Sequence, residues 1–327
     1  MTQVIPPRCR ISIALATYQG AAFLEAQLRS ILAQSRLPDQ LVLSDDASTD
    51  ATVAIAEATL ATAPFEWMIL QNPGPCGSSR NFAHALTRCT GDLIFFCDQD
   101  DIWDLDKIMC QAQILETSTE LGYCFCDARL VDAQLKPSGA RLWSSLSLEE
   151  SIKRYNSGRE AQASILLRQP LVTGTASVFR RSLLEALLPI PEGWIHDHWF
   201  SLAAAISGQK GYALDAALLA YRQHPQQQVG GQGLDLWGRL RNAWRTPPCI
   251  EAARFWQRAA KELAHRFPDS SSTVDASKMA VHLRICSRGR KRDFTSRVRI
   301  FLKEYHRGMY RFRNGSILSL LRDILLH

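Results

Sequence analysis

No stretch of the 327-residue chain approaches the roughly 18 to 20 consecutive apolar residues that a membrane-spanning helix requires. Residues 1–10 contain no apolar signal region, so we expect a protein that is not exported. The nine cysteines include no Cys-x-x-Cys pair, and Cys124 and Cys126 share one face of an expected strand. This pattern predicts reduced core thiols in a cytoplasmic protein and argues against a zinc site or a disulfide framework.

Two phosphate-handling signatures are also missing, the glycine-rich loop that ends in lysine and the Asp-x-Asp-x-Thr nucleophile sequence. The chain has no internal repeat. Hydrophobic residues make up 46% of the chain and charged residues 21%, which is ordinary for a globular protein. A chain of this length accommodates one large α/β domain with an appendage, or two domains.

Charge is distributed unevenly along the chain. Residues 237–327 carry 20 Lys and Arg against 7 Asp and Glu, a balance of +13, whereas residues 1–236 carry 18 against 25, a balance of −7. We therefore divide the chain into a domain of residues 1–232 and a basic, helical C-terminal region of residues 233–327. An acidic body with a basic end is typical of a soluble enzyme held near anionic lipid, more than of a nucleic-acid-binding protein.

Apolar, β-rich runs alternate with helical patterns over residues 11–132. Near-continuous apolar strands separated by helices indicate a sheet covered on both faces, so we expect an α/β fold with a mainly parallel, Rossmann-like sheet. After a polar, serine-rich stretch at 137–169, the pattern predicts a strand at 171–179, helices at 181–188 and 194–207, and a strand at 212–221. Residues 225–233 are typical of a flexible loop or lid. The first five expected strands span residues 11–16, 40–44, 65–70, 93–97 and 123–131.

Three carboxylates crowd into four residues at the end of the fourth expected strand, in the segment 95–103 (FFCDQDDIW). Carboxylates this close repel one another unless a cation lies between them, and their hard oxygen atoms suit Mg²⁺ or Mn²⁺ that also holds a substrate phosphate. The alternative is an acidic loop before a helix that Asp104 caps. Ligands of open α/β sheets bind at the carboxyl ends of the strands, which favours the metal site.

Polar residues also follow the first three strands. Ser48 to Asp50 would serve equally well as a helix cap, Arg80 as a surface charge and Asn81 as a local backbone partner. The adjacent carboxylates Asp45 and Asp46 cost desolvation energy unless they accept hydrogen bonds, which a base N–H or a ribose hydroxyl would donate. The strand ends therefore predict a nucleotide site, and its segments are 16–20 (ATYQG), 43–50 (LSDDASTD) and 72–81 (NPGPCGSSRN).

Three motifs, in this order, resemble glycosyltransferase family 2, the inverting A-type glycosyltransferases: residues 13–20 (IALATYQG), 44–50 (SDDASTD) and 98–103 (DQDDIW). The resemblance covers roughly residues 9–225, and the last motif is most similar to rhamnosyltransferase-like members of bacterial surface-polysaccharide pathways. It implies the A-type glycosyltransferase fold with a C-terminal helical extension. It also implies a nucleotide-diphosphate sugar as the donor and Mg²⁺ or Mn²⁺ as the cofactor.

The resemblance further implies roles for individual residues. Asp197, in a His-Asp-His-Trp sequence, resembles the family's catalytic base motif, which usually reads Glu-Asp or Asp-Asp, so this chain offers one carboxylate for the role. Trp194 and Trp199, on either side of it, would stack on an acceptor sugar or belong to the core, and His196 and His198 are read as structural. The expected nucleotide-binding residues are Thr17, Tyr18, Asp45, Asp46, Arg80, Asn81 and Asp98; the metal ligands are Asp98 and Asp100; and the diphosphate or acceptor residues are Trp199, Arg222 and His224.

Displacement of a nucleoside diphosphate from a sugar needs a general base on the incoming hydroxyl and positive charge on the leaving group. We therefore expect a metal-dependent inverting glycosyltransferase that moves a sugar, with rhamnose as a candidate, to a glycan or lipid-linked acceptor. Two alternatives stay open, a Mg²⁺-dependent phosphohydrolase or nucleotidyltransferase and a non-catalytic nucleotide-binding protein. Product formation from a nucleotide sugar distinguishes the three.

The basic C-terminal region predicts a second partner, the cytoplasmic face of an anionic membrane, and no nucleic acid. A dense basic run followed by a short helix with an apolar side favours such docking. The alternative is that these helices pack on the catalytic domain or pair two subunits into a homodimer. The basic run comprises Arg284, Arg288, Arg290, Lys291, Arg292, Arg297 and Arg299, and the apolar side comprises Ile317, Leu318, Leu320, Leu321, Ile324 and Leu325.

Overall fold

The computed structural model describes all residues except 1–7, 225–248, 290–291, 308, 311–323 and 325–327. The chain divides into two compact units, one formed by Met1–Arg159 and Leu171–Gln232 and the other by Glu160–Pro170 and Gly233–His327. The predicted loop at 225–233, the residues Arg290 and Lys291, and the predicted apolar helix side at 317–325, apart from Ile324, lie outside the described residues.

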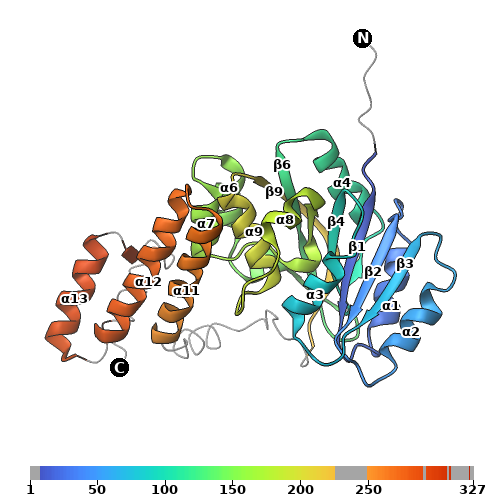
Figure 1. The fold of residues 1–327 in the computed structure, drawn as a ribbon, viewed down its shortest axis with the longest axis horizontal. Coiled ribbons are helices and arrows are strands. Elements are labelled where there is room, and N and C mark those ends of the chain that lie inside the picture. The colour runs from blue at the N-terminus through green and yellow to red at the C-terminus, as the bar shows by residue number, and fades with distance from the viewer. Residues whose placement is uncertain (1–7, 225–248, 290–291, 308, 311–323, 325–327) are drawn as a thin grey trace, which may run out of the picture. The chain divides into compact units, whose positions relative to one another are not determined.

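The N-terminal half of the first unit is a parallel sheet flanked by helices (Figure 1). Its two inner strands β1 and β2 are buried along nearly their whole length, which explains their continuous apolar sequences. The edge strand β3 is more exposed. The strands lie in the order β3-β2-β1-β4 and are β1 (Ile11–Thr17), β2 (Gln40–Asp45), β3 (Glu66–Gln71) and β4 (Leu93–Asp98); the intervening helices are α1 (Leu24–Leu32), α2 (Thr52–Leu60) and α3 (Ser78–Leu86).

The register of these strands aligns their carboxyl ends. Thr17, the last residue of β1, pairs with Asp45 of β2, and Ala16 pairs with Asp98 of β4. The polar residues that follow each strand therefore emerge at one edge of the sheet, as the α/β pattern of the sequence predicts.

The second half of the sheet has strands of mixed direction. β8 (Ser177–Arg180) runs antiparallel to both β4 and β6 (Leu121–Val131), and β9 (Lys210–Arg222) runs parallel to β6. The short strand β5 (Ile102–Trp103) pairs with β9, and β7 (Pro137–Arg141) pairs with β6. The β5–β9 pairing carries the end of β9 to the acidic segment. The α/β fold class is confirmed, with the parallel strands concentrated in the first half.

Several elements between residues 137 and 206 differ from the sequence-based expectation. The expected strand at 171–179 is reduced to β8, and a 3₁₀ turn, η1 (Gly174–Ala176), precedes it. The stretch at 137–169, expected to be loose, forms regular structure because residues such as Ile152 and Tyr155 are buried. The elements of this region are β7, α5 (Leu142–Ser145), α6 (Glu149–Ser157), α7 (Gln162–Arg168), η2 (Arg181–Leu183), α8 (Leu184–Leu187) and α9 (His196–Ile206).

Asp104 does not cap the helix that follows it, α4 (Lys107–Thr117), which begins without a side-chain cap. Its carboxylate instead forms two hydrogen bonds with the guanidinium group of Arg129 on β6. Such charge-assisted pairing is stronger than a neutral hydrogen bond, so a partner distant in sequence prevails over the local cap.

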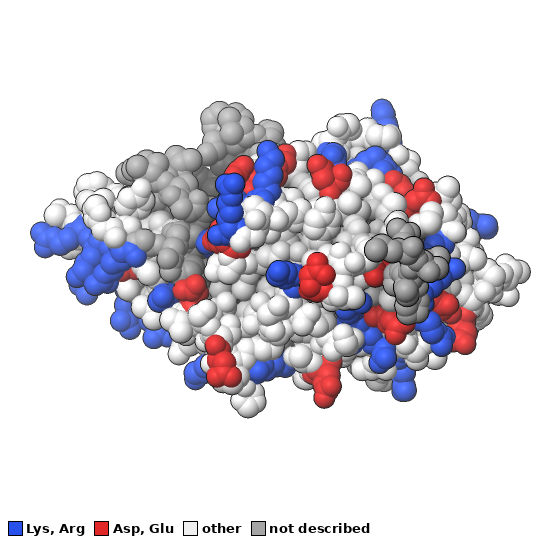
Figure 2. Space-filling view, turned by 90° about the horizontal axis from the view of Figure 1, so that it is seen from above, with Lys and Arg blue, Asp and Glu red and all other residues white. Residues whose placement is uncertain are grey.

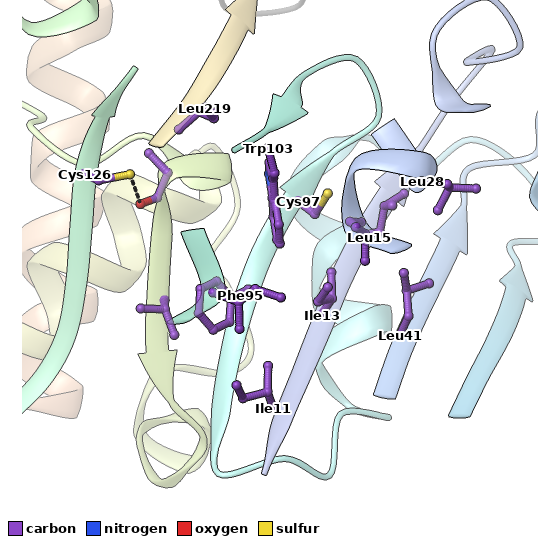
Figure 3. Packing of buried hydrophobic residues seen from close by; sticks show 14 of the residues in the cluster. Ile11, Ile13, Leu15, Leu28, Leu41, Phe95, Cys97, Trp103, Cys126 and Leu219 are labelled. Carbon is purple, nitrogen blue, oxygen red and sulfur yellow. Dashed lines mark hydrogen bonds between the residues drawn. The ribbon is translucent and has the colours of Figure 1, made fainter. Parts of the chain in front are cut away.

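The hydrophobic core of the first unit lies against the sheet (Figure 3). Side chains of Ile13 from β1, Leu41 from β2 and Phe95 from β4 point into it, and Trp103 and Leu219 extend it towards β9. Cys124 and Cys126 are buried free thiols, as the sequence predicts. The core therefore fixes the strands whose ends carry the polar segments.

The described residues of the second unit include α7 and the longer helices α11 (Cys249–Arg266), α12 (Ser271–Gly289) and α13 (Phe294–His306). Met279 and Leu283 of α12 pack on Ala253 of α11. Asp293 caps α13 by accepting the backbone N–H of Ser296 at 3.0 Å. Within the described part of the chain, no helix has both the length and the apolar character needed to cross a membrane.

Candidate active site

Side chains join the ends of β1 and β2 to α3. Thr17 Oγ1 donates a hydrogen bond to Asp45 Oδ1 at 2.8 Å, and Asn81 Nδ2 donates to the backbone carbonyl oxygen of Thr17 at 3.0 Å. All three residues are buried, whereas Arg80, the neighbour of Asn81 on α3, is exposed. Three of the residues predicted to bind a nucleotide therefore form one hydrogen-bonded group.

Asp45 and Asp46 both hold loops in place. Asp45 accepts the hydroxyl of Ser48 at 2.6 Å and its backbone N–H at 2.8 Å, and Asp46 accepts the backbone N–H groups of Cys76 at 2.7 Å and Gly77 at 2.8 Å. Burial opposes the charge on Asp46, but the hydrogen bonds from Cys76 and Gly77 outweigh it and hold the pKa of this carboxyl below its usual value. The hydrogen-bond donors to Asp45 and Asp46, which the sequence analysis expects from a bound nucleotide, thus come largely from the protein itself.

Gln99 links the end of β1 to the acidic segment. Its Oε1 accepts the backbone N–H of Tyr18 at 2.8 Å, and its Nε2 donates to the Tyr18 carbonyl oxygen at 3.0 Å. A Cβ atom at Gly20 would lie 2.3 Å from Gln99 Oε1, so the glycine makes room for this link. The Tyr18 side chain is 44% exposed and remains accessible to a ligand.

The acidic segment brings Asp98, Asp100 and Asp101 close enough to disfavour one another's charge. Burial, followed by the negative charges of Asp100 and Asp197, raises the pKa of Asp98 to about 8. Burial and then the charges of Asp100 and Asp98 raise the pKa of the fully buried Asp101 well above its usual value. The cluster therefore carries a repulsion that a bound cation would relieve.

The end of β9 supplies basic groups to this cluster. The backbone N–H of Arg222 donates to Asp101 Oδ1 at 3.1 Å, and its Nε donates to the carbonyl oxygen of Asp100 at 2.7 Å. His224 Nε2 lies 2.8 Å from Asp100 Oδ2. Phe23 packs against both basic side chains, 4.8 Å from the Arg222 guanidinium and 4.5 Å from the His224 ring centre. Arg222 and His224 thus lie at the acidic segment, and Phe23 is a support that the sequence did not reveal.

Asp197 lies in the first turn of α9, close enough to Asp98 for its charge to raise the pKa of that carboxyl. Its Oδ2 accepts the backbone N–H of Gly174 at 2.9 Å, and its Oδ1 accepts that of His198 at 2.6 Å. Gly174 belongs to η1, so the turn that replaces the expected strand orients this carboxylate. Asp197 is partly exposed, which a base that meets an incoming hydroxyl requires.

Trp199 does not reach the site, and its predicted contact with the diphosphate or acceptor is wrong. The side chain is fully buried, and its Nε1 donates to the carbonyl oxygen of Leu187 at 2.6 Å, which anchors α9 to α8. Trp194 is also buried. His196 stacks on Phe82 with ring centres 3.9 Å apart, and burial lowers the pKa of this histidine. The structural interpretation of His196 is confirmed.

A divalent metal fits the donor set at the end of β4. Asp98 and Asp100 offer the hard carboxylate oxygens that Mg²⁺ and Mn²⁺ prefer, and their mutual repulsion favours a cation between them. The described residues include no group of three or more His, Cys, Asp or Glu arranged to hold a metal ion. An ion that takes one or two carboxylates and completes its coordination with substrate phosphates and water needs no such group.

A buried lysine beside the acidic segment is absent from the sequence-based set of site residues. Lys107 is fully buried; its Nζ lies 4.1 Å from the Trp103 ring centre and donates to Gln111 Oε1 at 2.8 Å. Gln111 Nε2 donates in turn to the carbonyl oxygen of Ala176 at 2.9 Å, which ties α4 to η1. Nothing in the sequence marks Lys107 as buried, because a lysine at a helix start is ordinarily exposed.

Gly174→Ala should displace Asp197 without removing its carboxylate. A Cβ atom at this position would lie 2.6 Å from His196 Nε2, and the packing of that ring on Phe82 limits its movement. We expect a loss of about 1–3 kcal/mol in the free energy of unfolding, the usual cost of overpacking a filled core, measured by denaturant titration. Gly74→Ala is the control, because a Cβ atom there meets nothing within 4 Å. Equal stabilities of the two variants would contradict this account of η1.

Comparison with known proteins identifies the family. The model of glycosyl transferase family 2 matches residues 12–188, more than half of the chain, and the protein belongs to this family. It is therefore a glycosyltransferase, as the sequence motifs predict. The chain is 27% identical over 244 residues to the dTDP-rhamnosyl transferase RfbG of Shigella flexneri, with 70% of this chain and 80% of that protein covered. It is 26% identical over 194 residues to the uncharacterized glycosyltransferase alr2836 of Nostoc sp., with 57% of this chain and 55% of that protein covered.

Solved structures confirm the fold. TarS 1-349 of S. aureus in complex with UDP-GlcNAc superposes with a TM-score of 0.61 at 14% identity, over 96% of this chain and 87% of that one. The mannosyltransferase PcManGT of Pyrobaculum calidifontis in complex with GDP-Man and Mn²⁺ gives a TM-score of 0.56 at 16% identity, over 98% and 88% of the two chains. The protein has the A-type glycosyltransferase fold, with a helical C-terminal part.

Proposed function

We propose that this glycosyltransferase moves rhamnose or a related sugar from a nucleotide-diphosphate donor to a hydroxyl group of a glycan or lipid-linked acceptor in surface-polysaccharide synthesis. The observation that carries the proposal is the position of Asp197 beside Asp98, at the same edge of the sheet as the hydrogen-bonded group of Thr17, Asp45 and Asn81. The similarity to a dTDP-rhamnosyl transferase over 70% of the chain supports rhamnose as the sugar.

The nucleotide-sugar-binding catalytic domain comprises residues 1–232 in this proposal, and residues 233–327 form the basic helical region. The nucleoside binds at the ends of β1 and β2, where the exposed Tyr18 covers the base and Asn81 and Arg80 border it. Asp45 and Asp46 shape this site through the loops they hold, and each carboxylate keeps lone-pair capacity for a base or ribose donor.

The diphosphate lies at the acidic segment in this proposal, and Asp98 and Asp100 hold Mg²⁺ or Mn²⁺ there. When bound, the metal supplies positive charge that stabilises the leaving nucleoside diphosphate. Arg222 adds positive charge on the same side and His224 adds a ring nitrogen, since both contact Asp100. Phe23, packed against both, restricts their side chains and reduces the entropy lost on binding.

Asp197 is the general base of the proposed reaction. The acceptor oxygen forms a bond to the anomeric carbon, the bond from that carbon to the diphosphate oxygen breaks, and the acceptor proton passes to the Asp197 carboxylate. Its two backbone hydrogen bonds, from Gly174 and His198, hold the carboxylate in one orientation before the acceptor arrives. An inverting displacement uses such a base on the side of the sugar opposite the leaving group.

The proposed site of action is the cytoplasm, at the inner face of the cytoplasmic membrane, where lipid-linked acceptors are exposed. The net charge of +13 in residues 237–327 supports attraction to anionic lipid. A homodimer is a further proposal, which analytical ultracentrifugation of the full chain would test.

Nucleotide binding by the wild-type protein is the first test of this function. A nucleoside diphosphate that binds only the folded state should raise the unfolding midpoint, by an amount equivalent to about 2.7 kcal/mol at a concentration of 100 Kd. We expect the largest shift from dTDP with Mn²⁺ and a smaller shift from the same nucleotide with EDTA. Equal shifts of the unfolding midpoint with Mn²⁺ and with EDTA would show that the nucleotide binds without a metal ion. No shift with dTDP, UDP or GDP would contradict a nucleotide-sugar donor. Where a nucleotide does bind, product formation from dTDP-rhamnose identifies the reaction directly.

A further inference from the structure

One side of α13 is fixed on α12 by buried contacts. Glu304 Oε2 lies 3.0 Å from His282 Nδ1 of α12, and both side chains are almost fully buried. Phe301 is fully buried and packs with Cys286 of α12. Arg297 completes the buried face. These contacts determine which side of α13 faces outward.

The outward side of α13 exposes large apolar side chains. Phe294 is 55% exposed, Leu302 39% and Tyr305 38%. At 3.6 residues per turn, these three positions fall within roughly 80° of one another around the helix axis, with the half-buried Val298 between them. At 1.5 Å per residue, the stripe extends over roughly 16 Å of a helix that is roughly 20 Å long, and Val298 also packs against the buried cluster that contains Phe301.

Basic residues border this stripe on its exposed edge. Arg299, Lys303 and Arg307 follow at intervals of four residues, all exposed, so they form a row along one side of the helix. The only acidic residue within α13 is Glu304, which is buried, and its Oε1 accepts a hydrogen bond from Arg307 Nη1 at 3.2 Å, so it offsets part of the charge of Arg307. Figure 2 shows lysine and arginine side chains gathered over α12 and α13. The exposed side of α13 thus combines an apolar stripe with a basic edge, to which Arg299 and Lys303 contribute most of the net charge.

We propose that the outward side of α13 docks on an anionic lipid surface, with the stripe among the headgroups and the basic row on lipid phosphates. A helix with an apolar face and Lys or Arg along its border is suited to lie in the plane of a membrane interface. A second copy of this chain fits the surface poorly, because the two basic rows would repel each other. Nucleic acid would leave the apolar stripe in water. The inference rests on the proposed membrane location and not on the reaction.

Vesicle binding by the full chain, without donor or acceptor, tests this surface. We expect sedimentation with vesicles of phosphatidylglycerol and phosphatidylcholine in equal parts at low salt, and none with phosphatidylcholine alone. Binding should fall at 1 M salt, where the Debye length is about 3 Å. The variant R299E/K303E should bind at least about tenfold more weakly, and L302S/Y305S should also bind more weakly because the stripe no longer inserts.

The matched control is K136E/K153E, which makes the same charge change at exposed positions of the first unit. It should retain binding within a small factor of wild type. Circular dichroism and the dTDP thermal shift verify that all variants are folded and bind nucleotide, which separates a failure of this surface from a failure of the proposed reaction. The inference is overturned if wild type ignores anionic vesicles, if R299E/K303E binds as wild type does, or if the control loses binding equally. A dimer that dissociates in L302S/Y305S would assign the stripe to a second copy instead.

Discussion

Replacing Asp100 by asparagine should abolish the metal-dependent part of nucleotide affinity and reduce sugar transfer by about 10²–10³-fold. That magnitude is typical of removing one group that stabilises charge in a transition state. Asparagine keeps an oxygen that can accept a hydrogen bond from His224 Nε2, now 2.8 Å from the Asp100 carboxylate, so the local geometry is largely retained. Calorimetric titration of dTDP with and without Mn²⁺ measures the first effect, and a transfer assay measures the second.

The stability of the same variant gives an independent check on the acidic segment. Asp100 contributes to the raised pKa values of Asp98 and Asp101, so removing its charge relieves repulsion. Without metal, Asp100→Asn should therefore unfold at the same temperature as wild type or higher. Asp106→Asn, an exposed carboxylate at the start of α4, is the matched control and should keep both activity and the metal effect. A full metal effect in Asp100→Asn would show that the acidic segment does not bind the ion.

Asp197→Asn should lower kcat by roughly 10²–10⁴-fold and leave the Kd of the nucleotide sugar nearly unchanged. A base acts on the acceptor proton in the transition state and contributes little to donor binding in the ground state. Steady-state kinetics with saturating acceptor, together with calorimetry of donor binding, separates these quantities.

A fall in kcat caused by displacement of the side chain must be distinguished from one caused by loss of the carboxylate, because both Asp197 oxygens accept a backbone N–H. An asparagine amide nitrogen would face one of those donors, so the variant loses one of the two hydrogen bonds. Gly174→Ala provides the comparison, since it disturbs the same hydrogen bond but keeps the carboxylate. If kcat in Asp197→Asn stays within about tenfold of wild type, Asp197 is not the base. If Gly174→Ala reduces kcat as much as Asp197→Asn does, a displaced carboxylate explains both losses, and the kcat of Asp197→Asn does not by itself identify the base.

Local sequence was sufficient for the strands of the first half and the positions at which they end. Strand β1, for example, was expected at 11–16 and spans Ile11–Thr17. Buried strands are recognisable as continuous apolar runs, and the helices between them as apolar residues at helical spacing. The polar residues that follow each apolar run mark the position at which the strand ends. Parallel pairing then aligns Thr17, Asp45 and Asp98 at one edge without further information.

The local sequence does not specify contacts between residues that are distant along the chain, and the wrong expectations for Trp199 and Asp104 concern such contacts. Trp199, next to the candidate base, was expected near the acceptor, but helix α9 turns it into the core. Asp104 was expected to cap α4, but Arg129 on another strand binds it. Lys107 gave no sign of burial, because its aromatic neighbour Trp103 and its acceptor Gln111 are assembled only when α4 packs.

The sequence by itself determined that this protein is a family 2 glycosyltransferase with carboxylates at the ends of its parallel strands. The order of the motifs and the spacing of the apolar residues are properties of the local sequence and need no tertiary contact. Only the tertiary structure decided which basic side chains and backbone N–H groups contact each of these carboxylates. The β5–β9 pairing brings Arg222 and His224 to Asp100, although more than a hundred residues separate them. The η1 turn brings the Gly174 N–H to Asp197. Such contacts depend on strand order and packing, which no local pattern of residue types specifies.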